Sequence, residues 1–320
     1  MPVAPIKSTY EYGQLQFYND VKNIDLTHGL ITTRMHDSFE NIEMINDDIK
    51  IVIRVAQGAS FYHFIYDFLG TVVTCPKKRN QTFIFLMIFN DQLFNFNFIK
   101  KICDKHDIKF IFINKTNANL KINNFYYTSY LNPIACAKTP TSENIYNAVV
   151  GFVEKKPTKK VYISRKYMES SYPDIELTEA STRNTDRHKR IDNEEEIENF
   201  FKSYNFEILY PENSFDSLEQ QIDYFKDVKT LVGLTGAGLT NSVFMQPETN
   251  LVEIASPIIF YNRIYSTSIV DFSEAQHFFY SKIAFERKLF YYTVNNIEKK
   301  SNIVIERIKH NKGILDLLNE

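Results

Sequence analysis

Cysteine, tryptophan and long apolar runs are scarce or missing in this chain. Its 320 residues include three cysteines and no tryptophan. Cys75, Cys103 and Cys136 are odd in number and lack the spacing of metal or redox motifs, which favours reduced thiols over a disulfide framework. No run of about 18 apolar residues occurs and the first residues lack a signal-peptide pattern, so we expect no membrane span and a cytoplasmic location.

An excess of charge of either sign is also missing. Lys and Arg together number 37, and Asp and Glu together number 39, for a formal net charge of -2. The chain therefore has no global field that would attract nucleic acid or an anionic membrane, and neither is an expected partner. Any basic binding site must be local.

Alternation of strand-like and helical patterns runs through both halves of the sequence, which predicts parallel βαβ units and an α/β fold. In the first half, strand-like runs occupy 51–55, 83–89, 109–113 and 125–130, and helical patterns occupy 61–73, 93–103 and 142–153. In the second half, strand-like runs occupy 161–164, 206–209, 230–233, 251–254 and 289–294, and helical patterns occupy 194–204, 215–226, 239–245 and 303–318.

A polar, charged stretch around Pro157 interrupts this alternation and suits an interdomain connection. It predicts two domains, residues 1–155 and 156–320. The length of the chain fits two cores better than one. The final helix belongs to the second domain by sequence but could pack back on the first.

The sharpest local signal is a glycine-rich turn within residues 231–241, Leu-Val-Gly-Leu-Thr-Gly-Ala-Gly-Leu-Thr-Asn, between a buried strand and a helix. Glycines let backbone approach a ligand closely, and a helix start offers unpaired N–H groups, so the turn suits phosphate. A tight strand-to-helix connection is the structural alternative. A dinucleotide fingerprint is disfavoured, because the glycines are spaced G-x-x-G-x-G instead of G-x-G-x-x-G.

An ordered set of motifs across about residues 161–257 resembles glycosyltransferase family 61. They are Tyr162-Ile-Ser-Arg165, Arg190-Ile-Asp-Asn-Glu194, Phe206-Glu-Ile-Leu-Tyr-Pro-Glu212, Ser214-Phe-Asp-Ser-Leu-Glu-Gln-Gln221, the glycine-rich turn and Leu251-Val-Glu253-Ile. In the first half the resemblance rests on Ser60-Phe-Tyr-His63-Phe-Ile-Tyr-Asp67.

The resemblance implies a GT-B-like architecture, two Rossmann-like lobes with parallel sheets facing a central cleft. It implies an inverting mechanism with no obligatory metal or cofactor, a UDP-sugar donor, and a glycan or glycoprotein acceptor. The transferred unit would be a pentose such as xylose, or N-acetylglucosamine.

The candidate donor site lies in the second domain. Arg165 ends the first strand of that domain, where a fixed cation can bind a diphosphate; a surface ion pair is the alternative. Asn193 fits the family pattern but is equally a helix N-cap. The nucleotide-sugar-binding candidates are Arg165, Arg190, Glu212, Thr235, Gly236, Ala237, Gly238, Leu239, Thr240, Asn241 and Glu253.

The candidate catalytic residues are His63 and Asp67. Four residues apart, they would share one face of an α-helix, where either could take the acceptor proton; a structural pair is the alternative. One departure from the family is Thr235, which stands where members usually carry His and cannot carry charge. It supports a second hypothesis, a catalytically weak glycan- or nucleotide-binding relative. A Rossmann-type oxidoreductase is the third.

Overall fold

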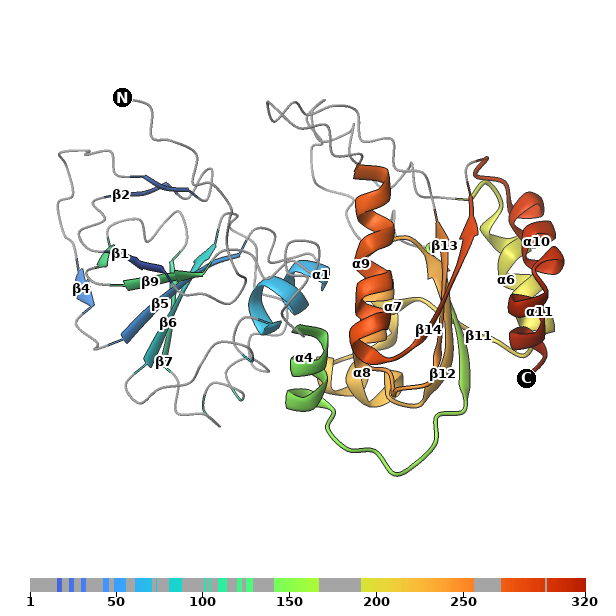
Figure 1. The fold of residues 1–320 in the computed structure, drawn as a ribbon, viewed down its shortest axis with the longest axis horizontal. Helices are drawn as coiled ribbons and strands as arrows, with labels where there is room; N and C mark the ends of the chain where they lie inside the picture. The colour runs from blue at the N-terminus through green and yellow to red at the C-terminus, as the bar shows by residue number, and fades with distance from the viewer. Residues whose placement is uncertain are drawn as a thin grey trace. The chain divides into compact units, whose positions relative to one another are not determined.

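The chain forms two units, Met1–Ala148 and Val149–Glu320, in a computed structural model. Each is described by itself below (Figure 1). The described residues are 16–18, 23–25, 30–32, 43–45, 49–55, 61–70, 73, 81–87, 101, 104, 109–113, 120–122, 125–128, 141–166, 191–255, 272–296 and 298–320.

The first unit contains a five-stranded sheet in the order β1-β9-β5-β6-β7. Strands β5, β6, β7 and β9 are parallel and confirm the four predicted strands, within a few residues at their ends. Their bounds are Ile49–Val55, Gln81–Met87, Lys109–Ile113 and Phe125–Thr128. The predicted helix over 93–103 lies almost wholly outside the described residues.

Several short strands of the first unit have no counterpart in the predicted pattern. Strand β1 (Gln16–Tyr18) pairs antiparallel with β9, so this sheet is not wholly parallel. Two further pairs join β2 (Asn23–Asp25) to β3 (Leu30–Thr32), and β4 (Glu43–Ile45) to β8 (Leu120–Ile122). With three residues each, these segments are too short to show a period.

The helix that follows β5 is not a regular α-helix. It begins as α1 (Phe61–His63) and continues as the π-helical segment η1 (Phe64–Leu69), which contacts β5. Helix α4 (Thr141–Val149) lies against it: the Tyr66 hydroxyl is 2.9 Å from Ser142 Oγ, and a Cβ at Gly70 would come within 3.0 Å of the Thr141 methyl. The two helices are therefore joined by a polar contact within a packed core.

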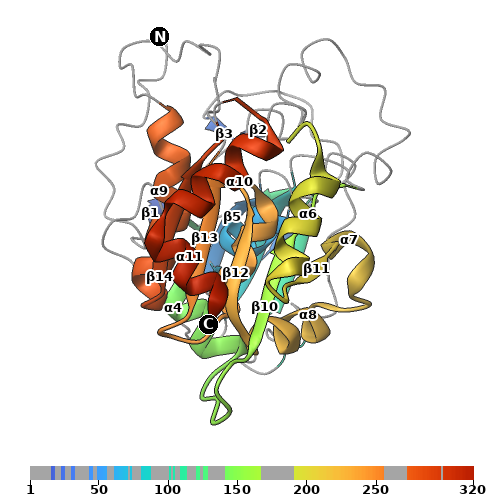
Figure 2. The same cartoon turned by 90° about the vertical axis from the view of Figure 1, so that its right-hand side faces the viewer.

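The second unit contains a five-stranded, wholly parallel sheet in the order β11-β10-β12-β13-β14. Figure 2 shows the strands side by side in this order. Their bounds are Lys159–Ile163 (β10), Glu207–Leu209 (β11), Val228–Leu234 (β12), Asn250–Ala255 (β13) and Phe290–Asn295 (β14). All five predicted strands are confirmed, because strands buried on both faces read as continuous apolar runs.

Helices cover both faces of this sheet (Figure 1). One face packs against α6 (Glu194–Ser203), α10 (Ser301–His310) and α11 (Lys312–Asn319). The other packs against the 3-10 helix η4 (Ala237–Phe244) and α9 (Phe272–Arg287), and α7 (Pro211–Ser214) and α8 (Leu218–Phe225) lie on the same side. No helix of the described parts is long and apolar enough to cross a membrane.

Two predicted helices of the second unit differ from the structure. The helix after the glycine-rich turn is a 3-10 helix, not an α-helix. The single helix expected over 303–318 is two helices, because Asn311 ends α10 and its side chain caps α11 by accepting the Ile314 N–H. Both contribute to the core of the second unit, through side chains such as Val304 and Leu317.

Candidate functional site

The strand order of the second unit creates a switch point between β10 and β12. The chain leaves β10 for β11 on one side, then crosses back to β12 on the other. Open α/β sheets of this order bind ligands beyond the carboxyl ends of the two strands where the direction reverses. Arg165 follows β10, and Thr235 and Gly236 follow β12. Candidates 70 residues apart in the sequence therefore meet at the position where this topology places ligands.

Arg165 lies directly against Gly236. A Cβ built on Gly236 would be 1.4 Å from Arg165 Nη2 and 2.6 Å from its Cζ, so the guanidinium occupies the space of any side chain at this position. Gly236 has φ 157° and ψ 179°, a conformation that is essentially restricted to glycine. Arg165 is only 7% exposed. The guanidinium of Arg165 and the glycine-rich turn are thus in direct contact.

The glycines on either side of Gly236 have a packing role. A Cβ at Gly233 would lie 3.0 Å from Leu239 Cδ2, and one at Gly238 would lie 3.0 Å from Ile163 Cγ2. They let η4 lie close on β10 and β12. The Leu239 N–H donates to Gly236 O at 3.0 Å and closes the first turn, so the N–H groups of Ala237 and Gly238 precede the hydrogen-bonded part of the helix.

A buried carboxylate contacts the glycine-rich turn through Thr235. Glu253, in β13, is 0% exposed. Its Oε1 accepts a hydrogen bond from Thr235 Oγ1 at 2.5 Å, and its Oε2 accepts one from the Tyr291 hydroxyl. Glu253 is one of the nucleotide-sugar-binding candidates, and its carboxylate is engaged inside the protein. Thr235, the departure from the family pattern, has its hydroxyl turned to this carboxylate.

Two tyrosines that the sequence analysis did not single out complete this network. The Tyr280 hydroxyl, from α9, donates to Gly236 O at 2.6 Å. Burial, and then the negative charge of Glu253, raise the pKa of Tyr280 and of Tyr291 well above the ordinary tyrosine value, so both hydroxyls stay protonated donors. Nothing local marks these two among the 20 tyrosines of the chain.

Two further residues of the glycine-rich segment have side chains buried inside the protein. Asn241 is fully buried; its Oδ1 accepts from Gln221 Nε2 at 2.7 Å, and its Nδ2 donates to Gly238 O at 2.9 Å. Thr240 is also fully buried and is a neighbour of the Tyr280 hydroxyl. The side chains of these two candidates face the interior, which leaves backbone groups and Arg165 to meet a ligand.

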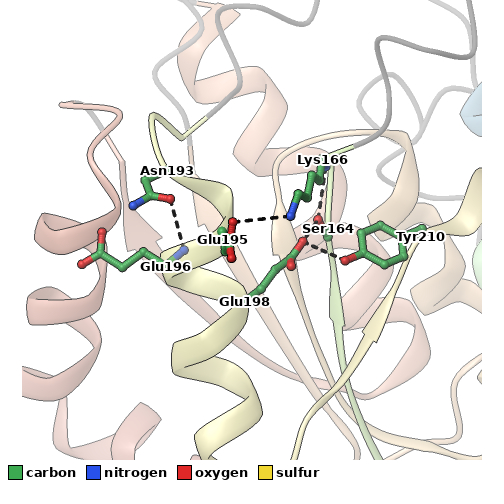
Figure 3. A network of polar contacts seen from close by, with 7 residues as sticks. All are labelled: Ser164, Lys166, Asn193, Glu195, Glu196, Glu198 and Tyr210. Atoms are coloured by element: carbon green, nitrogen blue, oxygen red, sulfur yellow. Dashed lines mark hydrogen bonds and ion pairs between the residues drawn. The ribbon is translucent and has the colours of Figure 1, made fainter.

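A second polar cluster surrounds the ends of β10 and β11 (Figure 3). Glu198, only 2% exposed, accepts from Ser164 Oγ at 2.7 Å and from the Tyr210 hydroxyl at 3.0 Å. Lys166 and Glu195 form an ion pair at 3.7 Å. These contacts tie α6 to the segment that carries Arg165.

The start of α6 also holds the backbone of Arg165. Glu194 Oε1 accepts from the Arg165 N–H at 3.1 Å and from the Tyr162 hydroxyl at 2.8 Å. Asn193 caps the helix, since its Oδ1 accepts the Glu196 N–H at 3.3 Å (Figure 3). The capping alternative for Asn193 is confirmed. Arg190 lies outside the described residues.

Three other candidates are placed by their backbone alone. His63 ends α1, Asp67 lies in η1, and Glu212 lies in α7. Residues Phe64–Leu69 are π-helical instead of α-helical as expected, and that His63 and Asp67 share one face of the helix stays a prediction. Among the residues whose side chains are described, no group of three or more His, Cys, Asp or Glu could hold a metal ion.

Comparison with known proteins gave one family match. The family model described as Glycosyltransferase 61 matches residues 61–252, more than half of the chain. The match runs from the helix of His63 and Asp67 through Arg165 and the glycine-rich turn into β13, and ends before Tyr280 and Tyr291. No curated protein matched the chain.

Proposed function

Because the chain belongs to glycosyltransferase family 61, we propose that it transfers a sugar from a UDP-sugar to a glycan or glycoprotein acceptor. The transferred unit is a pentose such as xylose, or N-acetylglucosamine. The observation that carries this proposal is the contact of Arg165 with Gly236 at the switch point of a parallel sheet.

In the proposed reaction the donor diphosphate binds at this switch point. Cleavage of the bond between the anomeric carbon and the phosphate oxygen leaves the bonding electrons, and so additional negative charge, on UDP. Arg165 and the N–H groups that begin η4 would stabilise that charge more in the transition state than in the ground state. We propose that these groups act without a metal ion.

In this proposal the acceptor binds beside His63 and Asp67 of the first unit. Its hydroxyl oxygen forms the new bond to the anomeric carbon, on the face opposite to the leaving UDP, and its proton passes to His63 or Asp67. The configuration of the sugar is inverted. Support comes from the π-helical segment that contains Asp67, since such segments are rare and frequently mark functional sites. The corresponding architecture is GT-B, with two lobes facing a cleft.

A second candidate is a relative that binds a nucleotide or glycan with little turnover. It is favoured by Thr235, because a threonine hydroxyl bonded to Glu253 supplies no positive charge to the diphosphate.

Two measurements test these proposals. Calorimetric titrations with UDP and other nucleoside diphosphates measure donor selectivity, and the UDP-sugars are then assayed for transfer with and without EDTA. Binding and EDTA-resistant transfer support the first candidate, and binding without turnover supports the second. Preference for another nucleotide would refute the UDP assignment, and restoration of an EDTA-abolished activity by manganese would refute the metal-independent mechanism.

A further inference from the structure

The carbonyl of Gly236 points into the second unit, where it accepts hydrogen bonds from two donors. One is the Leu239 N–H of its own turn, and the other is the hydroxyl of Tyr280, at 2.6 Å. Tyr280 is 5% exposed and comes from α9, 44 residues further along the chain. The orientation of this peptide is thus held by a side chain that the turn itself does not supply.

That orientation determines where the next N–H points. In a planar trans peptide the C=O of one residue and the N–H of the next are antiparallel. Gly236 O points toward the buried Tyr280 hydroxyl, so the Ala237 N–H points the opposite way. The N–H is thus directed away from a buried hydroxyl, and it belongs to a half-buried residue, as does that of Gly238, whereas Gly236 and Leu239 are buried.

Gly236 needs such a restraint because a glycine peptide rotates easily. Without a Cβ, glycine populates several backbone regions at similar cost, and a rotation of the Gly236–Ala237 peptide would present a carbonyl oxygen in place of the N–H. A carbonyl oxygen repels a phosphate, whereas an N–H at a helix start binds it. The hydroxyl of Tyr280 remains a donor, because burial and Glu253 raise its pKa.

We propose that Tyr280 is a positioning residue of the donor site: by holding Gly236 O, it keeps the Ala237 N–H turned outward, beside Arg165, for the diphosphate of the nucleotide sugar. This inference rests on the proposed function. In this role Tyr280 acts through the turn and not by touching the diphosphate, and it lies outside residues 61–252, which the family model matches.

The test compares Tyr280→Phe with Tyr224→Phe by calorimetric titration with UDP and with inorganic pyrophosphate. Tyr280→Phe keeps the ring and removes the donor to Gly236 O. Tyr224→Phe removes a hydroxyl beside Glu207, the first residue of β11. This hydroxyl therefore lies at the amino ends of the strands, whereas the donor site lies at their carboxyl ends. We expect Tyr280→Phe to raise the Kd of UDP and of pyrophosphate by a similar factor, roughly five- to tenfold. Tyr224→Phe should leave both Kd values unchanged.

The outcomes separate this inference from the proposed function. Unchanged affinities in Tyr280→Phe, or equal losses in both variants, would overturn the role of Tyr280 and leave the donor site in place. A wild-type protein that binds pyrophosphate as tightly as UDP would refute the nucleotide donor, with the pyrophosphate titrations still testing Tyr280. A wild-type protein that binds neither would overturn both.

A second measurement needs no variant. In the 15N-labelled wild-type protein, pyrophosphate should shift the Ala237 amide resonance to lower field, as expected for a new hydrogen bond to an anion. An Ala237 resonance that stays in place at saturating pyrophosphate would overturn the inference even if Tyr280→Phe failed to fold.

Discussion

Replacing Gly236 with alanine should damage the donor site through Arg165. The new Cβ would fall 1.4 Å from Arg165 Nη2, so the guanidinium must leave its position. The φ and ψ of Gly236 are also essentially restricted to glycine, which costs another residue about 1–3 kcal/mol of folding free energy. Loss of a charge-assisted contact to the diphosphate costs about 1.5–3 kcal/mol, or roughly 10- to 150-fold in Kd.

A double-mutant cycle on UDP affinity tests this reasoning. Arg165→Ala should raise the Kd of UDP by the same roughly 10- to 150-fold. The double variant should bind UDP little more weakly than either single variant, because Gly236→Ala acts by displacing the guanidinium that Arg165→Ala removes. Gly313→Ala is the matched control, since its Cβ would meet nothing closer than Asn311 Oδ1 at 3.6 Å. Fully additive losses, or wild-type affinity in Gly236→Ala, would refute the displacement of Arg165.

Four further variants test three separate parts of the structure. His63→Ala or Asp67→Asn should lower kcat by about 10²–10⁴-fold with UDP affinity unchanged, and near-normal kcat in both would make the pair structural. Thr235→Val removes a hydroxyl donor from buried Glu253; denaturant unfolding should show a loss of about 1–3 kcal/mol in the free energy of unfolding, and unchanged stability would contradict the buried bond. Asn193→Ala should cost about 0.5–2 kcal/mol by the same assay, unless the cap is dispensable.

Much of the second unit could be predicted from local sequence. Its strands are buried on both faces, so each reads as an apolar run, and Asn193 lies directly before an acidic first turn, as N-caps do. Arg165 and Gly236 could be assigned to one site before their contact was known, because parallel strands end at the same edge of a sheet. The single residue between Ile163 and Arg165 is enough to carry the chain from β10 to that edge.

The helical form of η4 could not be predicted in the same way. Residues 239–245 read as an ordinary helix, yet the segment is a 3-10 helix that starts at Ala237. It lies so close to the sheet that a Cβ at Gly233 or at Gly238 would come within 3.0 Å of a neighbouring side chain. How closely the helix packs depends on the strands beside it, and the hydrophobic pattern of the helix itself does not reveal this distance.

Thr235 shows how a substitution is interpreted differently once its neighbours are known. From the sequence alone, Thr235 replaces a histidine that could carry positive charge, and this replacement favours weak activity. In the structure its hydroxyl and that of Tyr291 both donate to Glu253, and a buried carboxylate without hydrogen-bond donors would be costly. Glu253 also lies near enough to Tyr280 to raise its pKa, so the carboxylate helps to keep that hydroxyl protonated, and the hydroxyl holds Gly236 O. The threonine therefore stabilises the hydrogen-bond network that holds the turn, and in the proposed reaction the positive charge comes from Arg165.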